Sequence, residues 1–369
     1  MNFFLSQLQG GPCGVLAPLQ GLIIKKLVFG GSTQDPPSAD EVLAALVESM
    51  AFTLGRVTYG DTVEVALISE ADQETDPLPS VFSARMHLSD YRRLVISRFS
   101  DFLDSPSAVL QFVFSLVLTK TPEEMHREFD DPTTPLIGRF GHCSQELVNL
   151  MLTGTATSNV FDGVQEMHYT DEPHECGDGC LKLTGVQVEH PLAIGYLSEL
   201  EALRYLQVGN TLKFPTLPIW IIGSASHYTV LFGRKVSDAA VSTERAVDLE
   251  ISRVFRMHAM VDGIAEEGKL QVLLRDMKLQ GLEEHKSIVK EGLILQEDFR
   301  AWVKEKLGIK DETAVVKDLN LWLVNGLEPV RVAEVTVSFS DIPKGEDESV
   351  LIQTIQTRWP GATVHMRKI

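Results

Sequence analysis

The chain has 369 residues, of which 44% are hydrophobic and 23% charged. That is the composition of an ordinary globular protein, and it argues against a disordered, collagen-like or coiled-coil chain. The 33 Lys and Arg residues and 51 Asp and Glu residues give a net charge of −18, which disfavours nucleic acid and anionic membranes as partners but suits a basic protein surface.

The N-terminal region is predicted to be mainly helical. Apolar residues at helical spacing predict a helix over 12–29, which we expect to bend at Pro18 because proline lacks a backbone N–H. A second helix is expected over 38–54, since Ser38 is a good N-terminal cap. A strand is predicted to follow over 63–69, ahead of an acidic loop.

The middle of the chain mixes helices with turn-forming residues. One or two helices are predicted over 88–118, and a further helix over 144–152 is expected to end at Gly154. Turn formers dominate 154–191, which favours a loop or hairpin there. Helical spacing returns over 197–206 and predicts another helix.

From residue 218 onward, the sequence predicts strands on either side of a charged helical segment. Two apolar runs, 218–222 and 228–232, are separated by a short Gly-Ser turn and predict a buried hairpin. We divide the chain into a first part of the core (1–242), a helical insertion (243–318) and C-terminal strands that complete the core (319–369). This order of elements is typical of an α+β fold.

The number of cysteines and the hydropathy of the chain indicate in which cellular compartment the protein is found. Four cysteines are too few for a disulfide scaffold, and the apolar N-terminal residues lack a basic stretch and are broken by Gly10-Gly11-Pro12, unlike a secretory leader. The apolar runs are shorter than the roughly 18 residues that a membrane-spanning helix needs. We therefore expect an intracellular protein of the cytoplasm, with the nucleus as an alternative.

The run QLQGGPCG at residues 7–14 has the features of a thiol nucleophile. A cysteine at the second position of a helix meets unpaired N–H groups and the positive end of the helix dipole, and both favour the thiolate. That cysteine is Cys13, and Gln7, six residues earlier, can direct its carboxamide N–H at an oxyanion. The alternative is a buried structural cysteine that follows a Gly-Pro turn.

A thiolate enzyme also needs a histidine, to hold the ion pair and to protonate the leaving amine. Among ten histidines, His227 stands out because it ends a turn and directly precedes the apolar run 228–232. A rigid strand would anchor it while its ring faces a loop edge. Other histidines, such as His126 and His258, lie among charged residues and are expected to be solvated. The alternative for His227 is a turn histidine satisfied by backbone groups.

Four segments resemble the MINDY family of deubiquitinases, in the branch whose nucleophile motif reads Q-x-x-G-G-P-C. The resemblance follows the family's order along nearly the whole chain. The segments are QLQGGPCGVLAPLQGLIIKKLVF (7–29), FGHCSQELVNLMLTGTATSNVFDG (140–163), FPTLPIWIIGSASHYTVLF (214–232) and IQTRWPG (355–361).

The resemblance implies a papain-like cysteine protease fold of the MINDY type, with Cys13 as nucleophile, His227 as general base and acid, and Gln7 as oxyanion donor. Gln9 is a rival glutamine, but the family's residue lies six before the cysteine. The residue that orients the histidine stays open. The resemblance also implies ubiquitin and polyubiquitin as partners, hydrolysis of isopeptide bonds in chains of the proteasome-targeting linkage, and no metal or cofactor.

The chain departs from the family's pattern in two places. Only twelve residues precede Cys13, fewer than in relatives, which bears on how firmly Gln7 is held. The inserted region resembles an EF-hand over 254–269, but His258 takes the first ligand position and Lys269 the twelfth, where a glutamate belongs. Calcium binding is therefore not expected.

Two further groups of residues suggest other chemistry. His174, Cys176 and Cys180 could ligate zinc, but their spacing is not a standard one, and a glycine-rich turn with two thiols explains them more simply. Cys143 beside His142 is a rival nucleophile, although adjacent residues cannot readily direct both side chains at one substrate. A packed cysteine at a helix start is the simpler interpretation.

Three functions remain open from the sequence. The first is a cysteine-type deubiquitinase. The second is a catalytically silent ubiquitin-binding scaffold of the same fold. The third is a papain-like enzyme for another acyl group, such as a transglutaminase or a peptidase for another modifier with a Gly-Gly tail.

Overall fold

The computed structural model divides the chain into two compact units, Met1–Ala239 with Leu319–Ile369, and Ala240–Asp318. Each unit is described by itself. The residues that the structure describes are 4–6, 11–32, 36–58, 60–68, 81–98, 103, 107–138, 140–168, 180–225, 227–240, 243–258, 263–277, 279, 288–309, 318–339 and 349–368.

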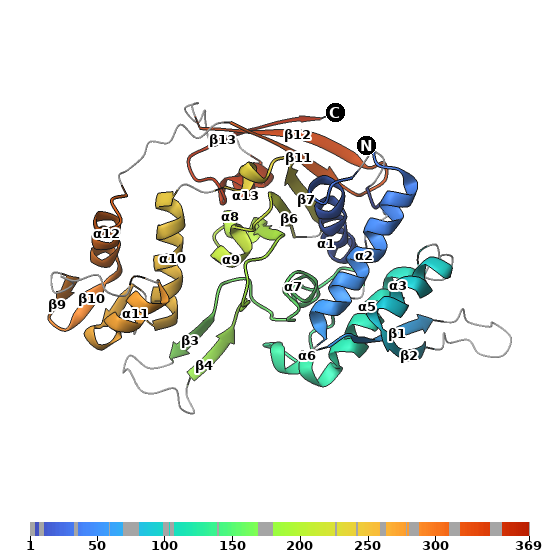
Figure 1. Cartoon of the computed structure of the whole chain (residues 1–369), viewed down its shortest axis with the longest axis horizontal. Helices are drawn as coiled ribbons and strands as arrows, with labels where there is room; N and C mark the ends of the chain where they lie inside the picture. Colours follow the sequence, from blue (N-terminus) through green and yellow to red (C-terminus); the bar gives the residue numbers. More distant parts are fainter. Residues whose placement is uncertain are drawn as a thin grey trace. The chain divides into compact units, whose positions relative to one another are not determined.

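A six-stranded sheet forms the centre of the first unit (Figure 1). In sheet order the strands are β13 (Thr363–Lys368), β12 (Arg331–Ser338), β11 (Leu319–Asn325), β7 (Tyr228–Gly233), β6 (Ile219–Gly223) and β5 (Gly195–Ser198). Strands β6 and β5 pair in parallel, and all other neighbours in this sheet are antiparallel. The predicted hairpin over 218–232 is confirmed as β6 and β7, and the α+β class is confirmed with it.

Strands β5 and β6 are buried on both faces, and helices pack on each face of the sheet. Helix α1 (Cys13–Ile24) packs on one face and α13 (Val350–Gln356) on the other. Strand β6 shows the expected period of two: Ile221 belongs to the cluster on the α1 side, while Trp220 belongs to the cluster with Trp359, the residue that follows α13 by three positions. The cysteine-bearing helix is thus fixed against β6 and β7.

More helices extend the α1 side of the sheet, as Figure 1 shows. The predicted helix over 38–54 is confirmed as α2, whose cap Ser38 forms a capping box with Glu41. The predicted helix over 144–152 is confirmed as α7, and Gly154 ends it in the left-handed conformation with φ 85°. These helices are α2 (Ala39–Val57), α3 (Leu88–Ser97), α5 (Ala108–Lys120), α6 (Pro122–Glu128) and α7 (Gln145–Thr153).

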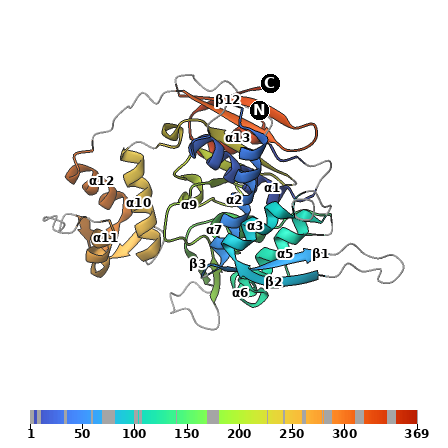
Figure 2. The ribbon, with the colours of Figure 1, turned by 45° about the vertical axis from the view of Figure 1, so that its right-hand side comes forward.

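A hairpin of β1 (Thr62–Ile68) and β2 (Val81–His87) lies beside α5 in both views of the ribbon (Figures 1 and 2). Polar side chains of α5 satisfy the free edge of β1: Ser115 accepts the N–H of Ala66 at 2.9 Å, and Thr119 accepts that of Glu64 at 3.0 Å. The remaining short elements are β3 (Val164–His168), β4 (Cys180–Thr184), α8 (Glu199–Ala202), α9 (Asn210–Lys213) and a 3₁₀ turn at Val236–Ala239.

Two expected helices differ from the structure. The helix expected over 12–29 continues through Pro18 but ends at Ile24, and a π-helical turn follows at Lys25–Phe29. The helix expected over 197–206 is wrong for most of its length. Leu197 belongs to β5, where pairing with β6 and burial on both faces outweigh helical spacing, and only the four residues of α8 are helical.

The second unit has its own core, in which the rings of Phe255 and Phe299 pack in a tilted arrangement with centroids 5.4 Å apart. A three-stranded sheet, in the order β8-β10-β9, lies among the helices. Gly263 has φ 75°, the conformation that the sharp turn of an EF-hand loop requires, while the His258 ring lies 2.7 Å from the Asp276 carboxylate. The elements are α10 (Thr243–His258), β8 (Ile264–Glu266), a 3₁₀ turn at Glu267–Lys269, α11 (Leu270–Asp276), β9 (Val289–Lys290), β10 (Leu293–Leu295) and α12 (Gln296–Lys306).

None of the helices within the described ranges combines the length and the apolar character that crossing a bilayer requires.

Candidate active site

Cys13 is the first residue of α1, one position earlier in the helix than the sequence predicts. Pro12 is the N-terminal cap, and its carbonyl accepts the N–H groups of Val15 at 2.8 Å and Leu16 at 3.0 Å, which starts the helix. Cys13 is only 4% exposed. A sulfur at this position lies at the positive end of the helix dipole, which favours the thiolate.

His227 occupies the place that the sequence predicts, at the end of the turn between β6 and β7. The carbonyl of His227 accepts both the N–H and the hydroxyl of Ser224 at 2.9 Å, which closes the turn. The Glu199 carboxylate accepts the N–H of Ala225 at 2.9 Å and ties the turn to α8. The backbone that carries the imidazole is therefore fixed from two sides.

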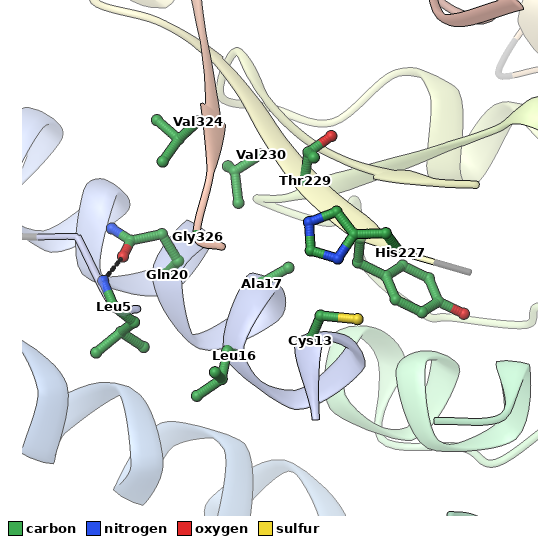
Figure 3. Close-up of a pocket in the computed structure, with 11 residues that line it drawn as sticks. Leu5, Cys13, Leu16, Ala17, Gln20, His227, Thr229, Val230, Val324 and Gly326 are labelled. Atoms are coloured by element: carbon green, nitrogen blue, oxygen red, sulfur yellow. Dashed lines mark hydrogen bonds between the residues drawn. The ribbon is translucent and has the colours of Figure 1, made fainter. Parts of the chain in front are cut away.

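Cys13 and His227 line the same cavity, although 214 positions separate them in the chain. In Figure 3 the Cys13 sulfur and the His227 ring face the same space between α1 and β7. The cavity is narrow, with a volume of about 20 Å³, which is room for about one water molecule. Its other walls are mostly apolar, with Leu16, Ala17, Val230 and Val324 among them.

Asn325, at the end of β11, is hydrogen-bonded to the catalytic candidate His227. Its Oδ1 lies 2.9 Å from Nε2 of the ring and also accepts the N–H of Leu327 at 3.0 Å. The bond from the Leu327 N–H identifies this atom as the carboxamide oxygen, which can accept hydrogen bonds but cannot donate them. Nε2 of the ring therefore donates to it and carries the proton. The other ring nitrogen, Nδ1, is then the one available to exchange a proton with a thiol.

Asn325 is not among the predicted site residues, because no local signal in the sequence marks it. The residue lies 98 positions after His227, beyond the second unit, and Asn-Gly is ordinarily a turn dipeptide. The sheet brings the two together, since β11 is the neighbour of β7 and Val324 pairs with Val230. Knowledge of that strand order would have pointed to the end of β11.

The segment that leads to the nucleophile is anchored at the cavity. The N–H of Leu5 donates to Oε1 of the buried Gln20 at 2.6 Å (Figure 3). The carbonyl of Leu5 faces Gly326, where an added β-carbon would lie 2.8 Å from the Leu5 oxygen. Only glycine therefore permits the backbone at 326 to lie this close to Leu5. Gln7, the predicted oxyanion donor, and its rival Gln9 lie outside the described residues.

Cys143, the rival nucleophile, packs behind Cys13 against the start of α1. A β-carbon at Gly14 would lie 2.5 Å from the Cys143 β-carbon. Burial raises the pKa of the Cys143 thiol to about 11, and the N–H groups of Gly14 and Val15 directed at the sulfur only partly oppose that shift. A thiol with this pKa is almost entirely protonated near neutral pH, which favours the interpretation of a packed structural cysteine.

The other candidate ligands of the sequence analysis are only partly described. Residues 169–179, with His174 and Cys176, lie outside the described ranges, so the zinc hypothesis stays untested. In the second unit, His258 is paired with Asp276 and lies at the end of α10. Asp262, at the fifth position of the EF-hand-like loop, lies outside the described residues.

Comparison with known proteins identifies the family. The family described as "Deubiquitinating enzyme MINDY-3/4, conserved domain" matches residues 1–253, which include both Cys13 and His227. The chain belongs to the MINDY-3/4 family of deubiquitinating enzymes. The predicted family and enzyme class are thereby confirmed.

Curated members of the MINDY-3/4 family match most of the chain. It is 30% identical to "Ubiquitin carboxyl-terminal hydrolase MINDY-3" of Bos taurus and of Homo sapiens, over 96% of this chain and 87% of each relative. It is 33% identical to "Probable ubiquitin carboxyl-terminal hydrolase MINDY-4" of Mus musculus, over 72% of this chain and 36% of that protein. No solved structure matches the chain.

Proposed function

We propose that this protein is a thiol-dependent isopeptidase of papain-like architecture that hydrolyses polyubiquitin. The observation that carries the proposal is the shared cavity of Cys13 and His227, with Asn325 hydrogen-bonded to the ring. A Cys-His-Asn set is the arrangement that papain-like proteases use. The names of the relatives supply the ubiquitin substrate, and the family resemblance supplies the preference for chains of the proteasome-targeting linkage.

The proposed reaction begins with proton transfer from Cys13 to Nδ1 of His227. The thiolate attacks the carbonyl carbon of ubiquitin's C-terminal glycine, and the carbonyl electrons move to oxygen. When the tetrahedral intermediate collapses, the C–N bond breaks and Nδ1–H protonates the departing lysine amine. Water, deprotonated by the same nitrogen, then hydrolyses the thioester and restores the Cys13 thiol.

In this proposal, Gln7 donates to the oxyanion together with a backbone N–H at the start of α1. The bond between Leu5 and Gln20 supports that role, because it anchors the chain two residues before Gln7. The narrow cavity favours a substrate tail without side chains, such as Gly-Gly, over bulkier tails.

The deciding experiment uses ubiquitin with a thiol-reactive vinyl or propargyl group at its C-terminus. The wild-type protein is expected to gain one ubiquitin in a covalent adduct, which denaturing electrophoresis and mass spectrometry detect. The Cys13→Ala variant should gain none, since the attacking sulfur is gone. Cys143→Ala is the matched control, and it should form the adduct normally because Cys143 is buried and protonated.

The outcomes separate the three functions left open by the sequence. If a wild-type protein that binds ubiquitin chains forms no adduct, the silent scaffold replaces the enzyme. If warheads on other Gly-Gly-tailed modifiers label Cys13 and the ubiquitin warhead does not, the substrate class is wrong. An adduct that persists in Cys13→Ala would refute the assignment of the nucleophile.

Asn325→Ala is expected to lower kcat/KM for polyubiquitin by about 10- to 100-fold. The change removes the acceptor of the Nε2 proton, so the ring loses its fixed tautomer and orientation. Asn325→Asp keeps an acceptor oxygen and adds a negative charge, which raises the pKa of the imidazolium. The upper limb of its pH–rate profile should therefore move to higher pH.

If Asn325 has only a structural role, both variants should have a lower thermal midpoint of unfolding. The upper limb of the pH–rate profile of Asn325→Asp should then coincide with that of the wild type. Rates from pH 5 to 10, with a thermal melt of each variant, distinguish the two interpretations.

A further inference from the structure

A second cavity lies between α1 and α2, at the end of α1 opposite to Cys13. Its volume is about 320 Å³, within the range of ligand-binding pockets. The walls are the apolar side chains of Leu22, Phe29, Phe52 and Leu217, together with Lys25, Lys26, Glu48 and Ser49. Lys25 lies twelve positions after Cys13 along the helix, a rise of about 18 Å, so this cavity is distinct from the candidate active site.

Two cations lie over the exposed ring of Phe52 and a third lines the same cavity, although the chain as a whole is strongly acidic. Lys25 Nζ and the Arg56 guanidinium each lie 4.6 Å from the ring centroid, and Lys26 is exposed beside them. Phe52 itself is 41% exposed. The ring thus gathers positive charge at the edge of an apolar cavity.

These cations have no anionic partner among the residues that the structure describes. No ion pair of the described part of the chain includes Lys25, Lys26 or Arg56. The carboxylate of the lining residue Glu48 is bonded instead to Arg92, at 2.9 Å. An anion from outside would find the charges of Lys25 and Lys26 at the wall of the cavity.

The positive charge is fixed in place. Arg56 donates to the carbonyl oxygens of Met151, at 3.2 Å, and Leu152, at the C-terminal end of α7. Partial burial, with the Arg56 charge as the next cause, lowers the pKa of Lys25. The fold therefore holds Lys25 where its own charge is disfavoured, and a bound anion would relieve that unfavourable interaction.

We propose that this cavity is a docking site for an acidic peptide segment that carries one large apolar side chain. The apolar side chain fills the space beside Phe29, Phe52 and Leu217, and flanking carboxylates pair with Lys25 and Lys26 at the edge. An apolar anchor within a charged rim is the usual anatomy of a peptide-binding hot spot. The complementary charge, in a chain of net −18, is what commits the site to an acidic partner.

The test is fluorescence anisotropy with the full chain and a fluorescein-labelled peptide, Gly-Glu-Asp-Phe-Glu-Asp-Gly. We expect micromolar binding at low salt that weakens as salt rises. Changing both lysines, Lys25→Gln with Lys26→Gln, should weaken binding about tenfold or more. Because Lys25 is half-buried and has no carboxylate partner within the described ranges, this double variant should melt no lower than the wild-type chain.

Matched controls decide whether the site is specific. The pair Arg85→Gln and Arg93→Gln removes two cations with exposed side chains at other places in the same unit and should leave the affinity within about twofold. A peptide with alanine in place of phenylalanine should bind at least about tenfold more weakly. Hydrolysis of polyubiquitin should be unchanged in the Lys25 and Lys26 variant, so failure of this site leaves the proposed function intact.

Three results would overturn the proposal. The first is a wild-type chain that does not bind the peptide at millimolar concentration. The second is equal weakening in the arginine control, which would mean general charge attraction. The third is a chain that binds decanoate, an alkyl carboxylate, in a manner that depends on Lys25, but does not bind the peptide. That result would assign the cavity to small amphiphiles.

Discussion

His227→Gln is expected to lower kcat/KM for polyubiquitin about 10³-fold while the fold is retained. The proposed mechanism uses the imidazole twice, first as the base that activates Cys13 and then as the acid that protonates the leaving amine. Positioned acid–base groups typically contribute 10²- to 10⁴-fold. Glutamine preserves the approximate length of the side chain and a hydrogen-bonding end, but it cannot titrate. Steady-state hydrolysis of labelled chains measures the loss.

The alkylation of Cys13 by iodoacetamide gives a second measurement of the same pair. The proposed mechanism places an ion pair of the Cys13 thiolate and the His227 ring in the wild-type chain, so we expect its alkylation to proceed below the ordinary thiol pKa of about 8.5. In His227→Gln the midpoint of the alkylation profile should move up toward that value. His190→Gln, at an exposed histidine, is the matched control. Unchanged hydrolysis and alkylation in His227→Gln would remove the histidine from the mechanism.

The chemistry-bearing residues were predictable where the local sequence carries the signal. Cys13 follows Gly-Gly-Pro at a helix start, and His227 ends the turn of a hairpin whose two apolar runs are visible in the sequence. Both predictions rest on turn-forming and helix-starting residues within a few positions, and the conformation of such residues is decided largely by their immediate neighbours in the chain. Their catalytic roles, and that of Gln7, stay predictions until the nucleophile is labelled.

Long-range pairing decided what the sequence analysis missed. Asn325 reaches His227 only because β11 enters the sheet beside β7 after the whole second unit has intervened. The same cause explains the wrong helix over 197–206, where parallel pairing of β5 with β6 overrides helical spacing. Periodicity within a window cannot report a partner strand that lies elsewhere in the chain.

The cavity between α1 and α2 is a third kind of feature, one that neither the local sequence nor the strand order reveals. Lys25 and Lys26 line it from the π-helical turn that follows α1, and in the sequence this pair resembles an ordinary solvated end of a helix. Only the packing of α1 against α2 shows that Lys25 and Arg56 share one aromatic ring. Charges that are unremarkable in sequence become informative when the fold places them together and the described part of the chain offers them no counter-ion.

Gly14→Ala is expected to destabilise the first unit by about 1–3 kcal/mol and to lower activity with it. Alanine would by itself favour the helix by about 1 kcal/mol, so the sign depends on the contact. The new methyl group would lie 2.5 Å from the Cys143 β-carbon and 3.2 Å from the Tyr228 ring. A β-carbon cannot move without its backbone, so the clash outweighs the propensity. Calorimetry of wild type and variant measures the loss as a lower thermal midpoint.

A double-mutant cycle identifies the contact that causes the loss. In a Cys143→Gly background the opposing β-carbon is gone, so Gly14→Ala should become much less costly there. In a Cys143→Ser background the β-carbon remains, and the cost should persist. An equal cost of Gly14→Ala in all three backgrounds would mean that the methyl group meets something other than Cys143. Because Tyr228 directly follows His227, the activity of the relieved double variant also reports whether this packing holds the histidine in place.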